Sequence, residues 1–216
     1  MIKTIILDMD GTMFDTEPLW EMAFLKTGQE LGYKFTKELH DKTISKNKYD
    51  LERILREELD DNFPFQTFLD NYVTNMKKIL NENKLPMKEG LKELLDYLIE
   101  YDYNIAIASS SSKEMIMGNL KRTDIDDTIF KVIVSGEDFI NGKPAPDIFL
   151  KTCELLDSNP KETIVIEDSN GGIKAAYTAG CIPILVPDVD VISEETMNMA
   201  KYTFDSLLEV IELLKQ

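Results

Sequence analysis

Histidine and cysteine, the side chains that most often bind zinc or act as thiol nucleophiles, are scarce in this sequence. Its 216 residues include one histidine, His40, and two cysteines, Cys153 and Cys181, with no Cys-x-x-Cys pair. The sequence therefore argues against a zinc site built from thiolates and imidazoles. We expect the two cysteines to be small buried side chains in a reducing compartment, and His40 to be an exposed residue near a helix end.

Positive charge and long apolar runs are also in short supply. Lysine and arginine number 24 against 40 aspartates and glutamates, which gives a formal net charge of −16. Such a surface repels nucleic acid and anionic membranes, so neither is an expected partner. The apolar run before Asp8 is too short for a signal peptide, and no run approaches membrane-spanning length. We expect a cytoplasmic protein, more readily a monomer than an oligomer.

Short apolar runs alternate with helical patterns over most of the chain. Such runs are apolar on both faces, as buried parallel strands are. The expected strands are Thr4–Leu7, Asn104–Ala108, Lys131–Val134, Thr163–Ile166 and Pro183–Val186, and the expected helices are Lys88–Tyr101, Lys113–Lys121, Asp147–Leu156, Gly172–Ala179 and Ser206–Lys215. This alternation predicts an α/β fold with a Rossmann-like, doubly wound parallel sheet.

One region breaks the alternation. Helical patterns without a good strand cover Pro18–Leu31, Lys48–Leu59 and Pro64–Asn81. We therefore expect two domains, an α/β core of residues 1–16 and 85–216 and an inserted all-helical domain of residues 17–84. Pro18 and Pro86 flank the two joins, where stiff chain suits a hinge.

Two aspartates follow the first expected strand, in the run Asp8-Met9-Asp10-Gly11-Thr12. Ligands of open parallel sheets bind beyond the carboxyl ends of the strands, which is where Asp8 and Asp10 would lie. One carboxylate could attack phosphorus while the other handles the proton of the leaving oxygen. Both could help to hold Mg²⁺, which prefers oxygen ligands. Asp-x-Asp alone could equally be a solvated turn.

Three further polar segments follow later strands. Ser109 and Ser110 open a serine run before a helix, where hydroxyls and backbone N–H groups can bind an anion or simply cap the helix. Lys143 lies between a glycine and prolines, and a lysine there could balance a phosphate and two carboxylates. Glu167 and Asp168 end another strand, where Asp168 could complete a metal site. Their joint occurrence at strand ends favours a phosphate-handling site.

With these residues in hand, the sequence resembles the haloacid dehalogenase superfamily of phosphatases and phosphomutases. The resemblance rests on four motifs in order, Asp8 to Thr12, Ser109, Lys143 and Glu167-Asp168, and it spans nearly the whole chain. The helical insertion is similar to the small cap of the subgroup that contains β-phosphoglucomutase and sugar-phosphate phosphatases.

The resemblance implies a role for each matching residue. Asp8 would be the nucleophile that forms an aspartyl-phosphate, and Asp10 the general acid and base. Asp8, Asp10 through its backbone carbonyl, and Asp168 would hold Mg²⁺, with Glu167 in or just outside the metal's ligand set. Ser109, Ser110 and Lys143 would bind the transferring phosphoryl group. The cap would close over a small phosphorylated metabolite and exclude water.

The resemblance also separates the alternatives. Metal-free dehalogenases lack the second aspartate that Asp10 supplies here, and nothing marks a cap lysine for phosphonate cleavage. β-Phosphoglucomutases carry a histidine where this chain has Trp20, and a cap arginine where it offers Lys46 and Lys48. We therefore expect hydrolysis, with a phosphomutase or a non-catalytic phosphate-binding module as alternatives. Trp20, Lys46 and Lys48 are expected substrate contacts, although Trp20 could instead pack within the cap.

Overall fold

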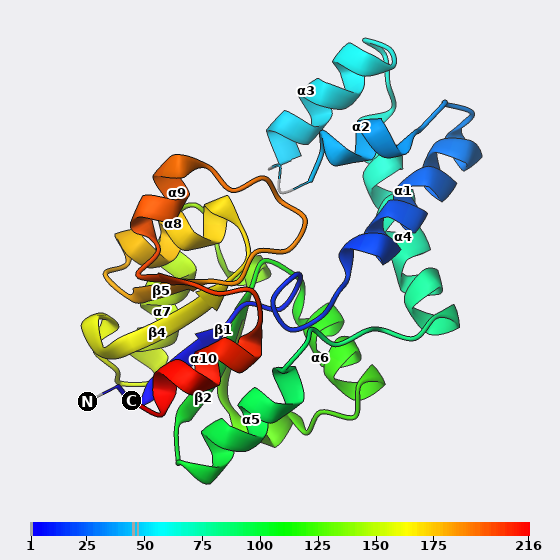
Figure 1. The fold of residues 1–216 in the computed structure, drawn as a ribbon. Coiled ribbons are helices and arrows are strands. Elements are labelled where there is room, and N and C mark those ends of the chain that lie inside the picture. The colour runs from blue at the N-terminus through cyan, green and yellow to red at the C-terminus, as the bar shows by residue number, and fades with distance from the viewer. Residues whose placement is uncertain (1, 45, 47) are drawn as a thin grey trace. The chain divides into compact units, whose positions relative to one another are not determined.

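A parallel sheet of six strands organises the computed structural model, which describes residues 2–44, 46 and 48–216 (Figure 1). The strands are β1 (Thr4–Leu7), β2 (Asn104–Ser109), β3 (Phe130–Ser135), β4 (Thr163–Glu167), β5 (Ile182–Leu185) and β6 (Tyr202–Thr203). Their order in the sheet is β3-β2-β1-β4-β5-β6, with every neighbouring pair parallel. Strand β1 therefore lies between β2 and β4, at the switch point beside which open α/β sheets bind ligands.

Helices connect the strands and form the inserted segment. They are α1 (Glu17–Leu31), α2 (Lys37–Asp41), α3 (Lys48–Glu58), α4 (Phe65–Glu82), α5 (Leu91–Glu100), α6 (Lys113–Arg122), α7 (Asp147–Leu155), α8 (Asn170–Thr178), α9 (Glu194–Met199) and α10 (Leu207–Leu214), with short 3-10 turns at Asp127–Ile129, Gly136–Asp138 and Pro160–Glu162. The predicted doubly wound sheet is confirmed. Within the described residues, no helix is both long and apolar enough to cross a membrane.

Two faces of the sheet are covered by different helices. Helices α7 and α8 pack on the strands, and their buried side chains join those of β1, β2 and β4 in one apolar cluster. Helix α10 packs against α5. Right-handed crossovers place α5 and α6 on the opposite face from α7 and α8, because the chain reverses its direction across the sheet between β3 and β4. The sheet is thus buried on both sides, as its apolar strands require.

The contacts divide the chain into two compact units. Unit 1 comprises Met1–Asp15 and Pro86–Gln216, and unit 2 comprises Thr16–Leu85. Unit 2 consists of α1 to α4, with α1 packed along α4. Its core is aromatic, and the buried members include Phe24, Phe63 and Phe68.

The prediction that His40 is exposed is wrong. His40 lies in α2 and is only 2% exposed, with its ring centroid 4.9 Å from that of Phe24. Its Nε2 lies 3.5 Å from Glu17 Oε1. Burial lowers the pKa of His40, although Glu21 and Asp41 oppose the shift. The five-residue helix α2 packs against α1, and so short an element gives no periodic pattern from which its buried face could be predicted.

The closeness of α1 to the segment that follows it leads to a stability prediction. A Cβ on Gly28 would lie 2.2 Å from Phe35 Cγ. Gly28→Ala must therefore displace a packed ring, and we expect it to lower the free energy of unfolding by about 1–3 kcal/mol in urea titrations followed by circular dichroism. Gly118→Ala is the matched control, because a Cβ there meets the movable Arg122 guanidinium. It should raise stability by roughly 0.5–1 kcal/mol. Equal stability of Gly28→Ala and wild type would contradict this packing.

Candidate active site

The end of β1 delivers Asp8 to the centre of the sheet's carboxyl edge. Asp8 follows Leu7, which pairs with Ile107 of β2 and Ile166 of β4, and its backbone N–H continues the ladder to Ile166 O at 3.0 Å. The side chain is buried. The chain then turns at Gly11, whose φ is +83° and where a Cβ would lie 2.2 Å from Asp168 Oδ2. Only glycine satisfies both conditions, because any other residue at position 11 would be strained in the turn and would displace the Asp168 carboxylate.

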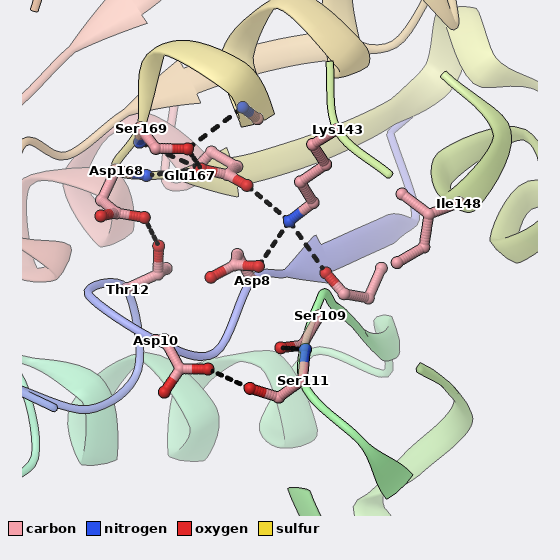
Figure 2. A network of polar contacts seen from close by, with 12 residues as sticks. Asp8, Asp10, Thr12, Ser109, Ser111, Lys143, Ile148, Glu167, Asp168 and Ser169 are labelled. Atoms are coloured by element: carbon pink, nitrogen blue, oxygen red, sulfur yellow. Dashed lines mark hydrogen bonds and ion pairs between the residues drawn. The ribbon is translucent and has the colours of Figure 1, made fainter. Parts of the chain in front are cut away.

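Lys143 joins the acids of two strands. Its Nζ lies 2.5 Å from Asp8 Oδ1 and 2.6 Å from Glu167 Oε1, and it donates to Ala108 O at 3.3 Å (Figure 2). The ammonium also lies 5.0 Å from the centroid of the Phe149 ring. The lysine side chain is 9% exposed. A buried ammonium needs such partners, because charge that leaves water unpaired is costly.

Glu167 is held in place by the start of α8. Its Oε2 accepts hydrogen bonds from Asp168 N at 3.0 Å, Ser169 N at 3.1 Å and Ser169 Oγ at 3.0 Å. Ser169 Oγ also accepts from Gly172 N and so caps α8. A Cβ on Gly172 would lie 1.8 Å from the Glu167 carboxyl carbon. Backbone donors therefore fix one oxygen of Glu167, which leaves the other for Lys143.

Asp8, Glu167 and Asp168 together form a cluster of oxygen ligands. Each offers a carboxylate oxygen, and these atoms all lie within 4.8 Å of one another. Thr12 Oγ1 donates to Asp168 Oδ1 at 3.3 Å. The cluster has three carboxylates and one ammonium, that of Lys143, so it keeps excess negative charge when the carboxylates are ionised. Hard oxygen ligands with surplus negative charge are what Mg²⁺ requires, so these residues fit that ion.

The serines that follow β2 make different hydrogen bonds. Ser111 Oγ donates to Asp10 Oδ2 at 2.6 Å, and Ser111 N donates to Ser109 Oγ at 3.1 Å. Ser112, not Ser109, caps α6 by accepting from Met115 N. Ser109 is buried at the end of β2, and its hydroxyl hydrogen can still be donated to a ligand.

The structure gathers most of the predicted site residues. Asp8, Asp10, Ser109, Lys143, Glu167 and Asp168 converge around one site (Figure 2). The side chain of Ser110 is exposed. The backbone of Ser110 lies close to Gly136, because a Cβ on Gly136 would be 2.4 Å from the Ser110 carbonyl oxygen. The network adds three hydroxyls that the sequence analysis did not select, those of Thr12, Ser111 and Ser169. Each lies within two residues of a selected acid or serine, and this closeness in sequence is the signal by which it could have been predicted.

The remaining predicted contacts belong to unit 2. The Trp20 ring lies 4.9 Å from Tyr72, so it packs within that unit, and its contact with a substrate stays a prediction. Lys46 and Lys48 are exposed, and their role in binding also stays a prediction. Their neighbours Ser45 and Asn47 lie outside the described residues.

Burial sets the proton affinity of the cluster. Burial raises the pKa of Asp8 to about 7, with Glu167 and Asp10 adding to the shift and Lys143 opposing it. Burial likewise raises the pKa of Asp168, and the charges of Glu167 and Asp8 add to this. Burial would lower the pKa of Lys143, but the charges of Asp8 and Glu167 outweigh it and raise that pKa overall. The lysine therefore stays charged, while Asp8 and Asp168 favour either a proton or a cation.

Comparisons with known proteins point to one family. The model of a family described as haloacid dehalogenase-like hydrolase matches residues 5–186. A phosphorylated carbohydrates phosphatase from Thermotoga maritima is 31% identical over 179 residues, which is 83% of this chain and 82% of that protein. Two solved structures have the same fold. A CbbY variant from Rhodobacter sphaeroides in complex with xylulose-(1,5)bisphosphate has a TM-score of 0.84 and 26% identity, covering 97% of this chain and 96% of that one. A β-phosphoglucomutase from Clostridium difficile has a TM-score of 0.79 and 25% identity, covering 97% and 93%.

The raised pKa of Asp8 leads to a prediction on stability. The folded state binds a proton at Asp8 up to about pH 7, whereas the unfolded state releases it near pH 3.8, so stability falls as pH rises between these values. Asparagine cannot ionise. In buffer with a chelator at pH 8 we expect Asp8→Asn to gain about 2 kcal/mol, or roughly 5 °C in Tm, over wild type, and to lose this advantage towards pH 4.

Two controls accompany this measurement. Asp96→Asn makes the same chemical change at an exposed aspartate of α5, and its Tm at pH 8 with chelator should stay close to that of wild type. Millimolar Mg²⁺ should raise the Tm of wild type more than that of Asp8→Asn, because the variant lacks a ligand carboxylate. A lower Tm for Asp8→Asn than for wild type at pH 8 with chelator would contradict the account of this cluster.

Proposed function

We propose that this chain, which belongs to the haloacid dehalogenase-like hydrolase family, is a magnesium-dependent phosphatase of small phosphorylated metabolites. The observation that carries the proposal is the buried Asp8 carboxylate at the switch point of the sheet, held at Oδ1 by Lys143. A nucleophile for phosphorus needs this fixed orientation and nearby positive charge.

We assign the metal to the carboxylate cluster. Asp8, Asp168 and the backbone carbonyl of Asp10 would hold Mg²⁺, and Glu167 would neighbour it while holding Lys143. The carboxylate oxygens of Asp8, Glu167 and Asp168, which lie within 4.8 Å of one another, support this assignment. When bound, the ion would neutralise charge on the phosphoryl oxygens.

The residues of the chain suggest a reaction in two halves. In the first, an oxygen of Asp8 bonds to phosphorus, the bond to the leaving oxygen breaks, and Asp10 gives that oxygen a proton. In the second, Asp10 takes a proton from water, the water oxygen bonds to phosphorus, and the bond to Asp8 breaks. Ser111 supports this use of Asp10, since its hydroxyl donates to Oδ2 and fixes the orientation of the carboxyl group. Lys143 and Ser109 would bind the phosphoryl group throughout.

Sugar phosphates are the substrate class that we propose. The phosphatase from Thermotoga maritima is named for phosphorylated carbohydrates, and the CbbY variant was solved with a sugar bisphosphate. We infer the same class here from the similarity of sequence and fold. The use of unit 2 as a cap, a cytoplasmic location and a monomeric state remain predictions.

Phosphomutase activity is the second candidate. The likeness to a β-phosphoglucomutase supports it, because the chains share a fold over nearly their whole length at 25% identity. The two reactions differ in the second half, where a sugar hydroxyl instead of water would take the phosphoryl group from Asp8. Trp20, in place of the histidine expected of a mutase, favours water.

Phosphate release from a panel of sugar phosphates tests the main proposal. We expect release that depends on Mg²⁺ and that Asp8→Asn lowers by roughly 10⁴-fold or more, because an amide is a far weaker nucleophile than a carboxylate. Asp96→Asn carries the same chemical change on the exposed face of α5 and should keep wild-type activity. Equal rates for Asp8→Asn and wild type would contradict the proposal.

The same panel separates the alternatives. Conversion of β-glucose 1-phosphate to glucose 6-phosphate with a bisphosphate primer, without release of phosphate, would identify a mutase. Tight binding of sugar phosphates without either reaction would identify a binding module.

The role of Asp10 predicts a dependence on the leaving group. A p-nitrophenolate leaves without protonation, whereas a sugar alkoxide does not. We expect Asp10→Asn to lower the single-turnover rate constant for release of the leaving group by about 10²–10⁴-fold with a sugar phosphate, and by much less with p-nitrophenyl phosphate. Equal losses for the two substrates would assign Asp10 a purely structural role.

A further inference from the structure

The two cysteines of the chain lie side by side, although they are 28 positions apart in the sequence. Cys153 belongs to α7 and Cys181 follows α8 just before β5, and their sulfur atoms are 3.9 Å apart. Both are free thiols. The sulfurs would have to approach by roughly 2 Å to form a disulfide. Burial of both cysteines was predicted and is confirmed, but their contact was not predicted.

The two thiols differ in their access to small molecules. Cys153 is 2% exposed and packs in the cluster under α7 and α8. Cys181 is 8% exposed and is one of the residues that line a cavity of ≈ 680 Å³, together with Tyr103, Tyr177, Met199, Tyr202 and Leu213. These lining residues belong to unit 1. A cavity of this volume admits a molecule of several hundred daltons.

Polar neighbours favour ionisation at one of the sulfurs. The hydrogen bond between the two thiols lowers the pKa of Cys153 to about 6, and the hydroxyls of Thr163 and Ser158 add to this shift, although burial opposes it. The pKa of Cys181 rises correspondingly. The pair thus shares one proton more readily than it holds two. A thiolate is the reactive species in thiol–disulfide exchange.

We propose that Cys153 and Cys181 form a redox-active dithiol, which a low-molecular-weight disulfide entering the cavity oxidises to an intramolecular disulfide. The site lies at the carboxyl ends of α7 and α8, whereas the carboxylate cluster lies before the amino end of α8. The dithiol is therefore separate from the catalytic residues, and the proposal does not rest on the proposed function.

Glutathione disulfide serves as the probe, and the reaction has two steps. Cys181 lines the cavity, and its sulfur bonds to one glutathione sulfur while its proton passes to the Cys153 thiolate 3.9 Å away. The S–S bond of glutathione disulfide breaks, and the first glutathione leaves as a thiolate. The Cys153 sulfur then bonds to Cys181 Sγ, and the second glutathione leaves with the proton of Cys153. The protein loses two electrons and the one proton that the pair shared, and glutathione disulfide gains them. A reductant that supplies both reverses the change.

The disulfide would restrict the unfolded chain more than the folded one. It would close a loop of 28 residues that includes β4 and α8. Oxidised protein should therefore melt roughly 5–10 °C above reduced protein.

Intact-mass analysis and a non-reducing peptide map of the folded protein after incubation with excess glutathione disulfide test the proposal. Wild type should lose both free thiols without retaining glutathione, and the map should show Cys153 joined to Cys181. Cys153→Ser should stop with one glutathione on Cys181. Cys181→Ser should keep Cys153 free, because the buried sulfur cannot reach the reagent. The rise in Tm should appear only in oxidised wild type and should disappear with reductant.

Other outcomes would overturn the proposal. Wild type could keep both thiols free, carry glutathione on each cysteine, or form disulfide-linked dimers, and any of these would mean that the pair is a packing contact without redox function. The wild-type result decides the matter even where a serine variant fails to fold.

Discussion

The buried ammonium of Lys143 is the interaction on which the site depends. It contacts Asp8 from β1 and Glu167 from β4, and so joins the central strand to its neighbour. Glu167 Oε1 is oriented to accept from Lys143 because backbone donors at the start of α8 fix the other carboxylate oxygen, Oε2. Removing the lysine would leave two carboxylates buried together, which is far more costly than leaving one exposed acid unpaired. The same contact fixes the orientation of the Asp8 carboxylate.

The buried acids of the site lower the stability of the folded chain. Burial raises the pKa values of Asp8 and Asp168, so their ionised forms destabilise the folded chain. Clusters of this kind are common at functional sites, where a cation or substrate relieves the repulsion. The formal net charge of −16 sharpens the point, because an anionic substrate must find its positive charge locally. Under the proposed function, Lys143 and a divalent ion held by the carboxylates would supply that positive charge.

Much of this arrangement could be predicted from the sequence, for definite physical reasons. Strands such as Thr4–Leu7 are apolar on both faces, and each is followed by polar residues that can lie only at the sheet's carboxyl edge. That is why Asp8, Ser109 and Asp168 were found. Three short elements escaped prediction. Helices α2 and α9 have five and six residues, which is too short for a helical hydrophobic period, and β6 has only two residues, both exposed, which gives no apolar run.

Long-range contacts of small polar groups also escaped prediction. Nothing local distinguishes Ser111, which contacts Asp10, from Ser110, which is exposed. The burial of His40 depends on how α2 packs on α1, and the contact of Cys153 with Cys181 depends on how α7 packs beside α8. Such pairs are set by tertiary packing, and a single sequence does not contain their distances.

Trapping of the covalent intermediate tests the central claim most directly. Borohydride reduces an acyl phosphate to an alcohol, so quenching the protein with it during turnover of a sugar phosphate would convert a phosphorylated aspartate into homoserine. Mass spectrometry of the tryptic peptide 4–26 would then locate the change among its acids. The account predicts homoserine at position 8, only when substrate is present. Turnover with an unmodified Asp8, or homoserine at another carboxylate, would contradict it.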